Sequence, residues 1–126
     1  MESENVEIVR RFCEAFGRRD SDELLEFFTE DGVYHNMPMA PMQGKAAIRT
    51  VLDMFLKMMS ESVEFVMLKI AEGDGAVLTE RLDRFLIGGK SVELPVAGVF
   101  ELKDGKIVAW RDYFDMGAWT RQTSGG

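Results

Sequence analysis

The sequence predicts an α+β domain in which a curved, mixed but mainly antiparallel sheet wraps around N-terminal helices. Apolar residues recur at helical spacing up to residue 59, and from residue 62 onward the hydrophobic period changes to two. The short sequences EGDG, GGK and KDGK interrupt the second half, and each favours a hairpin turn. The 126 residues, 46% of them hydrophobic, suit one domain covering 1–126 with a sizeable core.

Three helices are expected in the first half of the chain. Ser3 is a candidate N-cap for a helix that Gly17 closes. A second helix follows from Asp20, which has capping-box spacing to Glu23, and the two form a helical hairpin. The extended piece VYHN then leads into MPMAPMQG, where two prolines and Gly44 prevent regular structure. The third helix has six apolar residues at helical spacing: Ile48, Val51, Leu52, Phe55, Leu56 and Met59.

Strands are expected at residues 62–71, 76–87, 91–102 and 106–115, because alternating segments there are separated by the three turn sequences. Successive hairpins make this part of the sheet antiparallel. The last residues, TRQTSGG at 120–126, are expected to form a loose tail.

Composition argues against several classes of function. A net charge of −7 disfavours nucleic acid or an anionic membrane as a partner. Cys13 is the only cysteine and His35 the only histidine, so the sequence predicts neither a disulfide nor a usual zinc site. The longest apolar run, LPVAGVF, is much shorter than the roughly 20 residues of a membrane span. We therefore expect a soluble, cytoplasmic protein without metal or cofactor.

An arginine and an aspartate interrupt an apolar row of the strand at 76–87. Residues i and i+2 of a strand point to the same face. Arg81 and Asp83 therefore share a face with Val77, Thr79, Phe85 and Ile87. The opposite register would turn the leucines of LTERLDRFLI inward and leave the charged pair in solvent. The strand alone leaves both registers open, because Glu80 and Arg84 make the leucine row amphipathic too.

Two other strands show the same kind of interruption. Asp112 lies between Trp110 and Phe114 on one face of the last strand, and Tyr34 and Asn36 share a face of VYHN. If these faces line one concavity, it contains two carboxylates, a guanidinium, a phenol and an amide between apolar walls. Buried charges of this kind persist either as a satisfied network or as a working site. His35, which lies between Tyr34 and Asn36, is expected to face the opposite way.

These residues lie in segments that resemble the limonene epoxide hydrolase family. The segments are YHNMP at 34–38, ERLDRF at 80–85 and GVFELKDGKIVAWRDYFD at 98–115, and with the helical half the resemblance covers nearly the whole chain. The family belongs to a wider group of cone-shaped α+β domains similar to nuclear transport factor and ketosteroid isomerase. The resemblance therefore implies a sheet that encloses a cone-shaped pocket.

The resemblance also implies a role for each polar residue. Asp112 would take a proton from a water molecule held by Tyr34 and Asn36, and Asp83 would protonate the epoxide oxygen. Arg81 would lie between the carboxylates and orient both. Opening an epoxide requires a nucleophile and a proton for the departing oxygen, which two carboxyl groups in opposite protonation states supply.

Together with the residues, the resemblance implies a cofactor-independent epoxide hydrolase that adds water to a small apolar epoxide, terpene-like or cyclic. The resemblance also implies a homodimer. Six residues are expected to line the substrate pocket: Met37, Phe55, Leu94, Val96, Trp110 and Phe114. One alternative is an isomerase or dehydratase on the same fold, although that chemistry has no evident role for Arg81. The other is a non-catalytic small-ligand-binding domain, which would not need acid, base and water-holding groups together.

Overall fold

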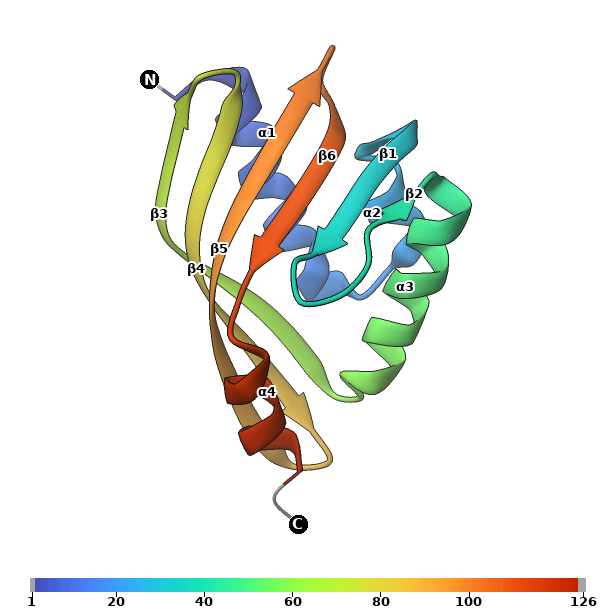
Figure 1. Cartoon of the computed structure of the whole chain (residues 1–126), viewed down its shortest axis with the longest axis vertical. Coiled ribbons are helices and arrows are strands. Elements are labelled where there is room, and N and C mark those ends of the chain that lie inside the picture. The colour runs from blue at the N-terminus through green and yellow to red at the C-terminus, as the bar shows by residue number, and fades with distance from the viewer. Residues whose placement is uncertain (1, 125–126) are drawn as a thin grey trace.

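The computed structural model describes residues 2–124 as one curved sheet with helices packed against it (Figure 1). In this view α1 lies behind the sheet, α3 runs beside β1 and β2, and α4 lies at the bottom near the C-terminus. The elements in chain order are α1 (Glu4–Ala15), the 3₁₀ helix η1 (Phe16–Arg18), α2 (Ser21–Leu25), β1 (Phe28–Asn36), β2 (Met42–Gln43), α3 (Lys45–Met58), β3 (Ser62–Gly73), β4 (Ala76–Ile87), β5 (Lys90–Lys103), β6 (Lys106–Tyr113) and α4 (Met116–Thr123).

The sheet is mixed and mainly antiparallel, as the sequence predicts. Its strand order is β2-β1-β6-β5-β4-β3. In the described part of the chain only β1 and β6 pair in parallel, and this pairing sets Tyr34 beside Trp110 and Asn36 beside Asp112. The N-terminal half of the chain thereby contributes side chains to the same surface as the C-terminal meander.

The four long strands agree with the predicted ranges to within two residues at each end. Each hairpin turns through two successive residues with positive φ, the conformation of a turn whose twist matches that of its strands. The pairs are Asp74 and Gly75, Gly88 and Gly89, and Asp104 and Gly105.

An aromatic cluster joins α1 to the concave face of the sheet. Phe12, fully buried on α1, makes edge-on contacts with five aromatic rings, which belong to Phe16, Phe27, Phe28, Phe100 and Trp110. Burying a side chain of this size stabilises the fold by roughly 1.5–3 kcal/mol. The Oγ of Ser3 accepts from the backbone N–H of Val6, which confirms the predicted cap of this helix.

The N-terminal elements differ from the prediction in their boundaries. The left-handed residue after the first helix is Arg19, with φ 57°, and not Gly17. The second helix ends at Leu25, and Phe28 already begins β1. Pairing of Phe28 with Ile107 of β6 extends the strand back through an irregular stretch that ends at Val33.

The expected loose tail was wrong for residues 120–123, which form the last turns of α4. Asp115 caps this helix through Oδ1, which accepts from the backbone N–H of Gly117. Gln122 holds the helix to β5, because its side-chain amide donates to the carbonyl of Glu93 and accepts from the N–H of the same residue. Residues 125–126 of the predicted tail lie outside the described residues. No helix within residues 2–124 has the length and apolar character needed to cross a membrane.

Candidate active site

Three charged side chains meet on the concave face of the sheet. Arg81 is fully buried, and Asp83 and Asp112 are each 4% exposed. Nε and Nη2 of Arg81 donate to Asp83 at 3.0 and 2.9 Å, and Nη1 and Nη2 donate to Asp112 at 3.1 and 2.7 Å. Leu78, in contrast, is 48% exposed. The charged pair of β4 therefore points inward, and the alternative register is wrong.

Gly98 of β5 makes room for this cluster. It lies opposite both Thr79 of β4 and Asp112 of β6. A Cβ at this position would lie 2.6 Å from Nη1 of Arg81, 2.7 Å from Oγ1 of Thr79 and 2.8 Å from Oδ1 of Asp112. The absent side chain leaves the space through which Arg81 reaches across the middle strand. Sequence reasoning did not identify Gly98 or Thr79, although both lie on the face that carries the charged residues.

Burial and neighbouring charges shift the pKa values of Asp83 and Arg81. Burial raises the pKa of Asp83 to about 6, against the opposing attraction of Arg81. Burial also disfavours the charge of Arg81, yet Asp112 and Asp83 hold the pKa of its guanidinium well above the usual value. With all three groups ionised the cluster has a net charge of −1, so one added proton neutralises it. A proton on Asp83 is then available to a reacting oxygen.

A phenol and an amide lie next to Asp112. Oη of Tyr34 donates to Oδ1 of Asn36 at 3.1 Å. The Tyr34 ring stacks on Trp110, with centroids 4.1 Å apart and planes 8° from parallel. Burial raises the pKa of Tyr34 far above the neutral range, so the phenol keeps its proton. The five polar residues predicted from the sequence therefore converge on one site.

An apolar cavity of about 300 Å³ opens over these groups. Tyr34, Asn36, Asp83 and Asp112 supply its polar lining, and four of the six predicted wall residues, Phe55, Leu94, Val96 and Phe114, line it as expected. The remaining walls come from α3, the loop after β1, the strands β3 and β4, and α4: Met39, Val51, Met54, Met58, Met59, Phe65, Phe85, Met116 and Trp119.

Two predicted wall residues are corrected by the structure. Met37 is not among the lining residues, and the neighbouring Met39 takes that place. Trp110 is also absent from the lining, because the ring of Tyr34 covers it and leaves it fully buried. Its Nε1 instead donates to Oδ1 of Asp112 at 2.7 Å. An inward-facing strand residue can thus contact the residues that line a cavity without lining it itself.

The contribution of α4 to the cavity was missed from the sequence. Met116 and Trp119 lie on this helix, and the Trp119 ring meets Phe85 edge-on at 5.9 Å. Asp115, a residue type that often caps helices, precedes this segment and could have indicated the helix. The glycines at the end of the chain suggested a loose segment instead.

His35 is not part of this arrangement. Its Nε2 lies 2.8 Å from the carbonyl oxygen of Met39, and the residue does not line the cavity. Among residues 2–124 there is no cluster of three His, Cys, Asp or Glu side chains placed to hold a metal ion. The two inward carboxylates are already engaged by Arg81.

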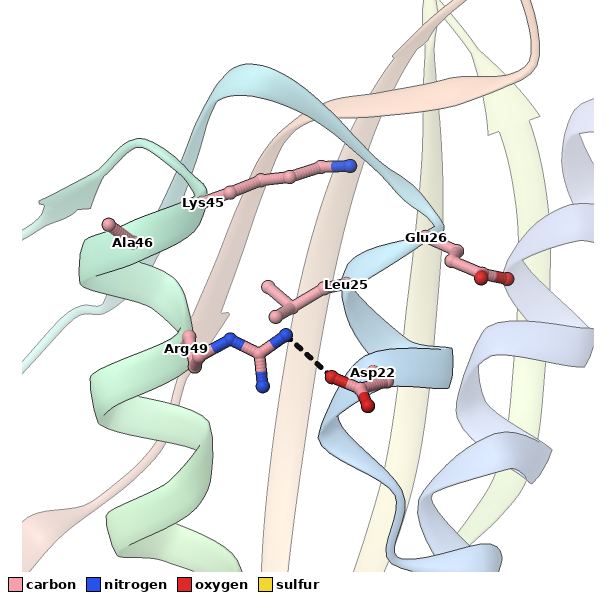
Figure 2. Close-up of a pocket in the computed structure, with 6 residues that line it drawn as sticks. All are labelled: Asp22, Leu25, Glu26, Lys45, Ala46 and Arg49. Atoms are coloured by element: carbon pink, nitrogen blue, oxygen red, sulfur yellow. Dashed lines mark hydrogen bonds and ion pairs between the residues drawn. The ribbon is translucent and has the colours of Figure 1, made fainter.

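A second hollow lies on the surface between α2 and α3 (Figure 2). Its volume is about 480 Å³, and Arg49 donates to Asp22 across it at 2.6 Å. Both of these side chains are well exposed to solvent. The hollow is lined by Asp22, Leu25, Glu26, Lys45, Ala46 and Arg49. None of the residues predicted for catalysis is among them.

Comparison with known proteins places this chain in a family. The model of the limonene-1,2-epoxide hydrolase catalytic domain matches residues 3–124. Epoxide hydrolase EphG of Mycobacterium tuberculosis (strain ATCC 25618 / H37Rv) is 35% identical over 108 residues, which is 86% of this chain and 71% of that protein. The solved structure of a limonene-epoxide-hydrolase-like enzyme of M. tuberculosis is 34% identical, covers 98% of this chain and 91% of its own, and has a TM-score of 0.79.

More distant structures share the fold alone. A SnoaL-like polyketide cyclase structure from Shewanella denitrificans OS-217 has a TM-score of 0.88 at 11% identity and covers 99% of this chain and 100% of its own. The cone-shaped α+β fold expected from the sequence is therefore confirmed. From the match over residues 3–124 and the identity to an epoxide hydrolase, the chain belongs to the limonene-1,2-epoxide hydrolase family.

Proposed function

We propose that this protein hydrolyses small apolar epoxides, terpene-like or cyclic, to vicinal diols in one step by general acid and base catalysis. The observation that carries the proposal is the Asp83, Arg81 and Asp112 cluster at the polar end of an otherwise apolar cavity. Apolar walls suit a hydrocarbon substrate, and the few polar groups are concentrated where bonds would change.

In the proposed reaction, water binds beside Tyr34 and Asn36, and Asp112 removes its proton as the water oxygen attacks an epoxide carbon. The bond from that carbon to the epoxide oxygen breaks, and Asp83 gives its proton to the departing oxygen. Arg81 stays charged and holds both carboxylates in place. The proton left on Asp112 then returns to Asp83, since a pair bridged by one guanidinium acts as a coupled set that shares one proton.

Direct attack by water is favoured over a covalent ester route. An ester on an aspartate would need a second base to activate the water that cleaves it. His35, the only histidine, contacts the carbonyl of Met39 and does not line the cavity. Asp112 with Tyr34 and Asn36 can instead hold and deprotonate water at the site of attack.

Single turnover in oxygen-18 water tests this route. With enzyme in excess over a cyclic epoxide, the first diol formed should already carry the label, and peptides containing Asp83 or Asp112 should carry none. An unlabelled first diol followed by label in an aspartate would replace the proposal with an ester mechanism. Conversion of the epoxide to a product other than a diol would favour an isomerase or dehydratase, and binding without turnover would favour a ligand-binding domain.

We also propose a homodimer formed through the outer face of the sheet. Leu78 and Tyr113 point away from the cavity on β4 and β6 and are 48% and 44% exposed. A second copy would bury these apolar side chains by a symmetric contact. Sedimentation should give twice the monomer mass, and Leu78→Lys should shift the protein toward monomer. A monomeric wild type across micromolar concentrations would reject the dimer without affecting the catalytic proposal.

A further inference from the structure

Trp110 contacts Asp112, the proposed base, and Tyr34, which is proposed to hold the water, but it does not line the cavity. The side chain is fully buried, and its Nε1 donates to Oδ1 of Asp112 at 2.7 Å. The indole stacks on two rings. The ring of Tyr34 has a centroid distance of 4.1 Å and an interplanar angle of 8°, and the ring of Phe100 has a centroid distance of 5.5 Å and an interplanar angle of 14°. A side chain held in this way has little freedom to move.

The hydrogen bonds to Asp112 distinguish its two oxygen atoms. Oδ1 accepts from Nη1 of Arg81 at 3.1 Å and from Nε1 of Trp110 at 2.7 Å. Among residues 2–124, Oδ2 accepts only from Nη2 of Arg81, at 2.7 Å. A carboxylate oxygen offers about two acceptor sites, so Oδ1 is filled and Oδ2 keeps one. The free acceptor of Oδ2 is the one that can take a proton from water.

The same indole ring also supports the group that holds the water. In the parallel pairing of β1 with β6, Tyr34 lies beside Trp110 and Asn36 beside Asp112. Stacking on Trp110 fixes the plane of the Tyr34 ring, and Oη of Tyr34 reaches Asn36 from there. The strand pairing and the stacking on Trp110 together set how the base lies relative to the water-holding pair.

We infer that Trp110 is a positioning residue, which fills Oδ1 of Asp112 and thereby directs Oδ2 at the water held by Tyr34 and Asn36. The inference rests on the proposed hydrolysis. It specifies which oxygen of Asp112 acts as the base and which residue leaves that oxygen free to do so. Trp110 does not line the cavity, so its loss should lower kcat and leave KM nearly unchanged.

The first test is Trp110→Phe, which keeps an aromatic ring for stacking and removes the N–H. The expected result is a fall in kcat of at least about 10-fold, the usual effect of losing a hydrogen bond to a charged group, with KM within about 3-fold of the wild type. Phe100→Leu serves as the control, because it alters the packing around Trp110 and keeps the N–H. This control should retain kcat within about 3-fold.

The pH profile separates positioning from a general loss of packing. Arg81, Asp83, Tyr34 and the buried thiol of Cys13 are the ionisable groups around Asp112, and Trp110→Phe changes none of them. A carboxylate that loses a donor becomes easier to protonate, because hydrogen bonds to the charged form favour that form. The acidic limb of kcat against pH should therefore move to higher pH in Trp110→Phe and stay in place in Phe100→Leu.

A closer isostere keeps the test decisive if Trp110→Phe does not fold. Benzothienylalanine inserted at position 110 retains the bicyclic ring and replaces the N–H by sulfur, and it should reproduce both the lower kcat and the shifted acidic limb. A folded benzothienylalanine protein with the kcat and pH profile of the wild type would overturn the role of Trp110. Absence of diol from the wild type itself would reject the proposed function and this role with it.

Discussion

Gly98 and Asp112 face each other across β5 and β6, and a Cβ on Gly98 would come within 2.8 Å of Oδ1 of Asp112. The same Cβ would collide with Nη1 of Arg81 at 2.6 Å. Gly98→Ala should displace the guanidinium from one or both carboxylates. We expect activity to fall by about 100-fold or more, the effect of a misplacement of about 1 Å, and stability to fall by about 1–3 kcal/mol.

Gly73→Ala is the matched control for this substitution, because Gly73 also lies in a strand and a Cβ there would meet nothing within 4 Å. Diol formation and chemical unfolding should be measured on both variants. Full activity in Gly98→Ala would mean that the cluster tolerates a shift of Arg81 and that its geometry is not critical.

The two carboxyl groups should act as one unit. Asp112→Asn and Asp83→Asn should each lower kcat by at least about 100-fold, since each removes the base or the acid. The double variant should be little worse than either single variant, because members of one catalytic unit are strongly non-additive. Glu80→Gln, an exposed acid on the same strand as Asp83, is the control. Losses that multiply in the double variant would show that the residues act independently.

Stability should depend on pH through Asp83. The folded protein keeps this proton up to about pH 6, whereas an unfolded aspartate releases it near pH 3.9. Between these values the folded state binds more protons, so the free energy of unfolding contributed by Asp83 falls as pH rises, by on the order of 3 kcal/mol. Asp83→Asn lacks this titration. Urea unfolding at pH 4 and pH 7 should therefore show that the free energy of unfolding of the variant increases relative to that of the wild type as pH rises. Equal changes in the free energy of unfolding of the two proteins would contradict the raised pKa of Asp83.

The same proton is expected to limit catalysis. If Asp83 is the acid, kcat should decline as pH rises above about 6, because burial raises the pKa of its carboxyl to that value. The measurement is kcat for diol formation from pH 5 to 9. A rate that stays constant to pH 9 would assign the acid role to another group.

Gln122 should control how firmly α4 closes the cavity. Its two hydrogen bonds to Glu93, at 2.9 and 2.7 Å, hold the helix that carries Trp119. Gln122→Ala should raise KM about 10-fold, because the loss of two hydrogen bonds of about 1 kcal/mol each loosens this wall, and should leave kcat within about 3-fold. Arg121→Ala is the control, since that side chain is 73% exposed. An unchanged KM in Gln122→Ala would show that packing of Trp119 on Phe85 is sufficient to hold α4.

Chelating agents are expected to leave activity unchanged. Both inward carboxylates are engaged by Arg81, and His35 does not line the cavity. The carboxylate ligands that a divalent metal would need are therefore already paired with a guanidinium. The assay is diol formation after incubation with EDTA and dialysis. Activity that is lost with the chelator and restored by a divalent metal would overturn the acid and base mechanism.

Local patterns in the sequence were sufficient for most elements and for the polar residues of the site. A period of two along β4 predicts that Arg81 and Asp83 share a face, and the same period along β6 predicts that Asp112 shares a face with Trp110 and Phe114. Alternation of side chains is a property of each strand by itself. The cap at Ser3 and the three hairpin turns were also predictable, since each depends on residues adjacent in the chain. The register of β4 was the exception, because both of its faces carry charged residues.

Only the tertiary structure decided which inward residues reach the cavity. Parallel pairing of β1 with β6 brings residues from distant parts of the chain together, and stacking of Tyr34 on Trp110 then buries the indole that the sequence had placed in the pocket wall. Glycine is needed at position 98 because Arg81 reaches across the neighbouring strand. The helix α4 is held in place because Gln122 forms a hydrogen bond with the backbone of Glu93. These contacts join segments far apart in sequence, and their free energy comes from close packing and long-range pairing that no local pattern encodes.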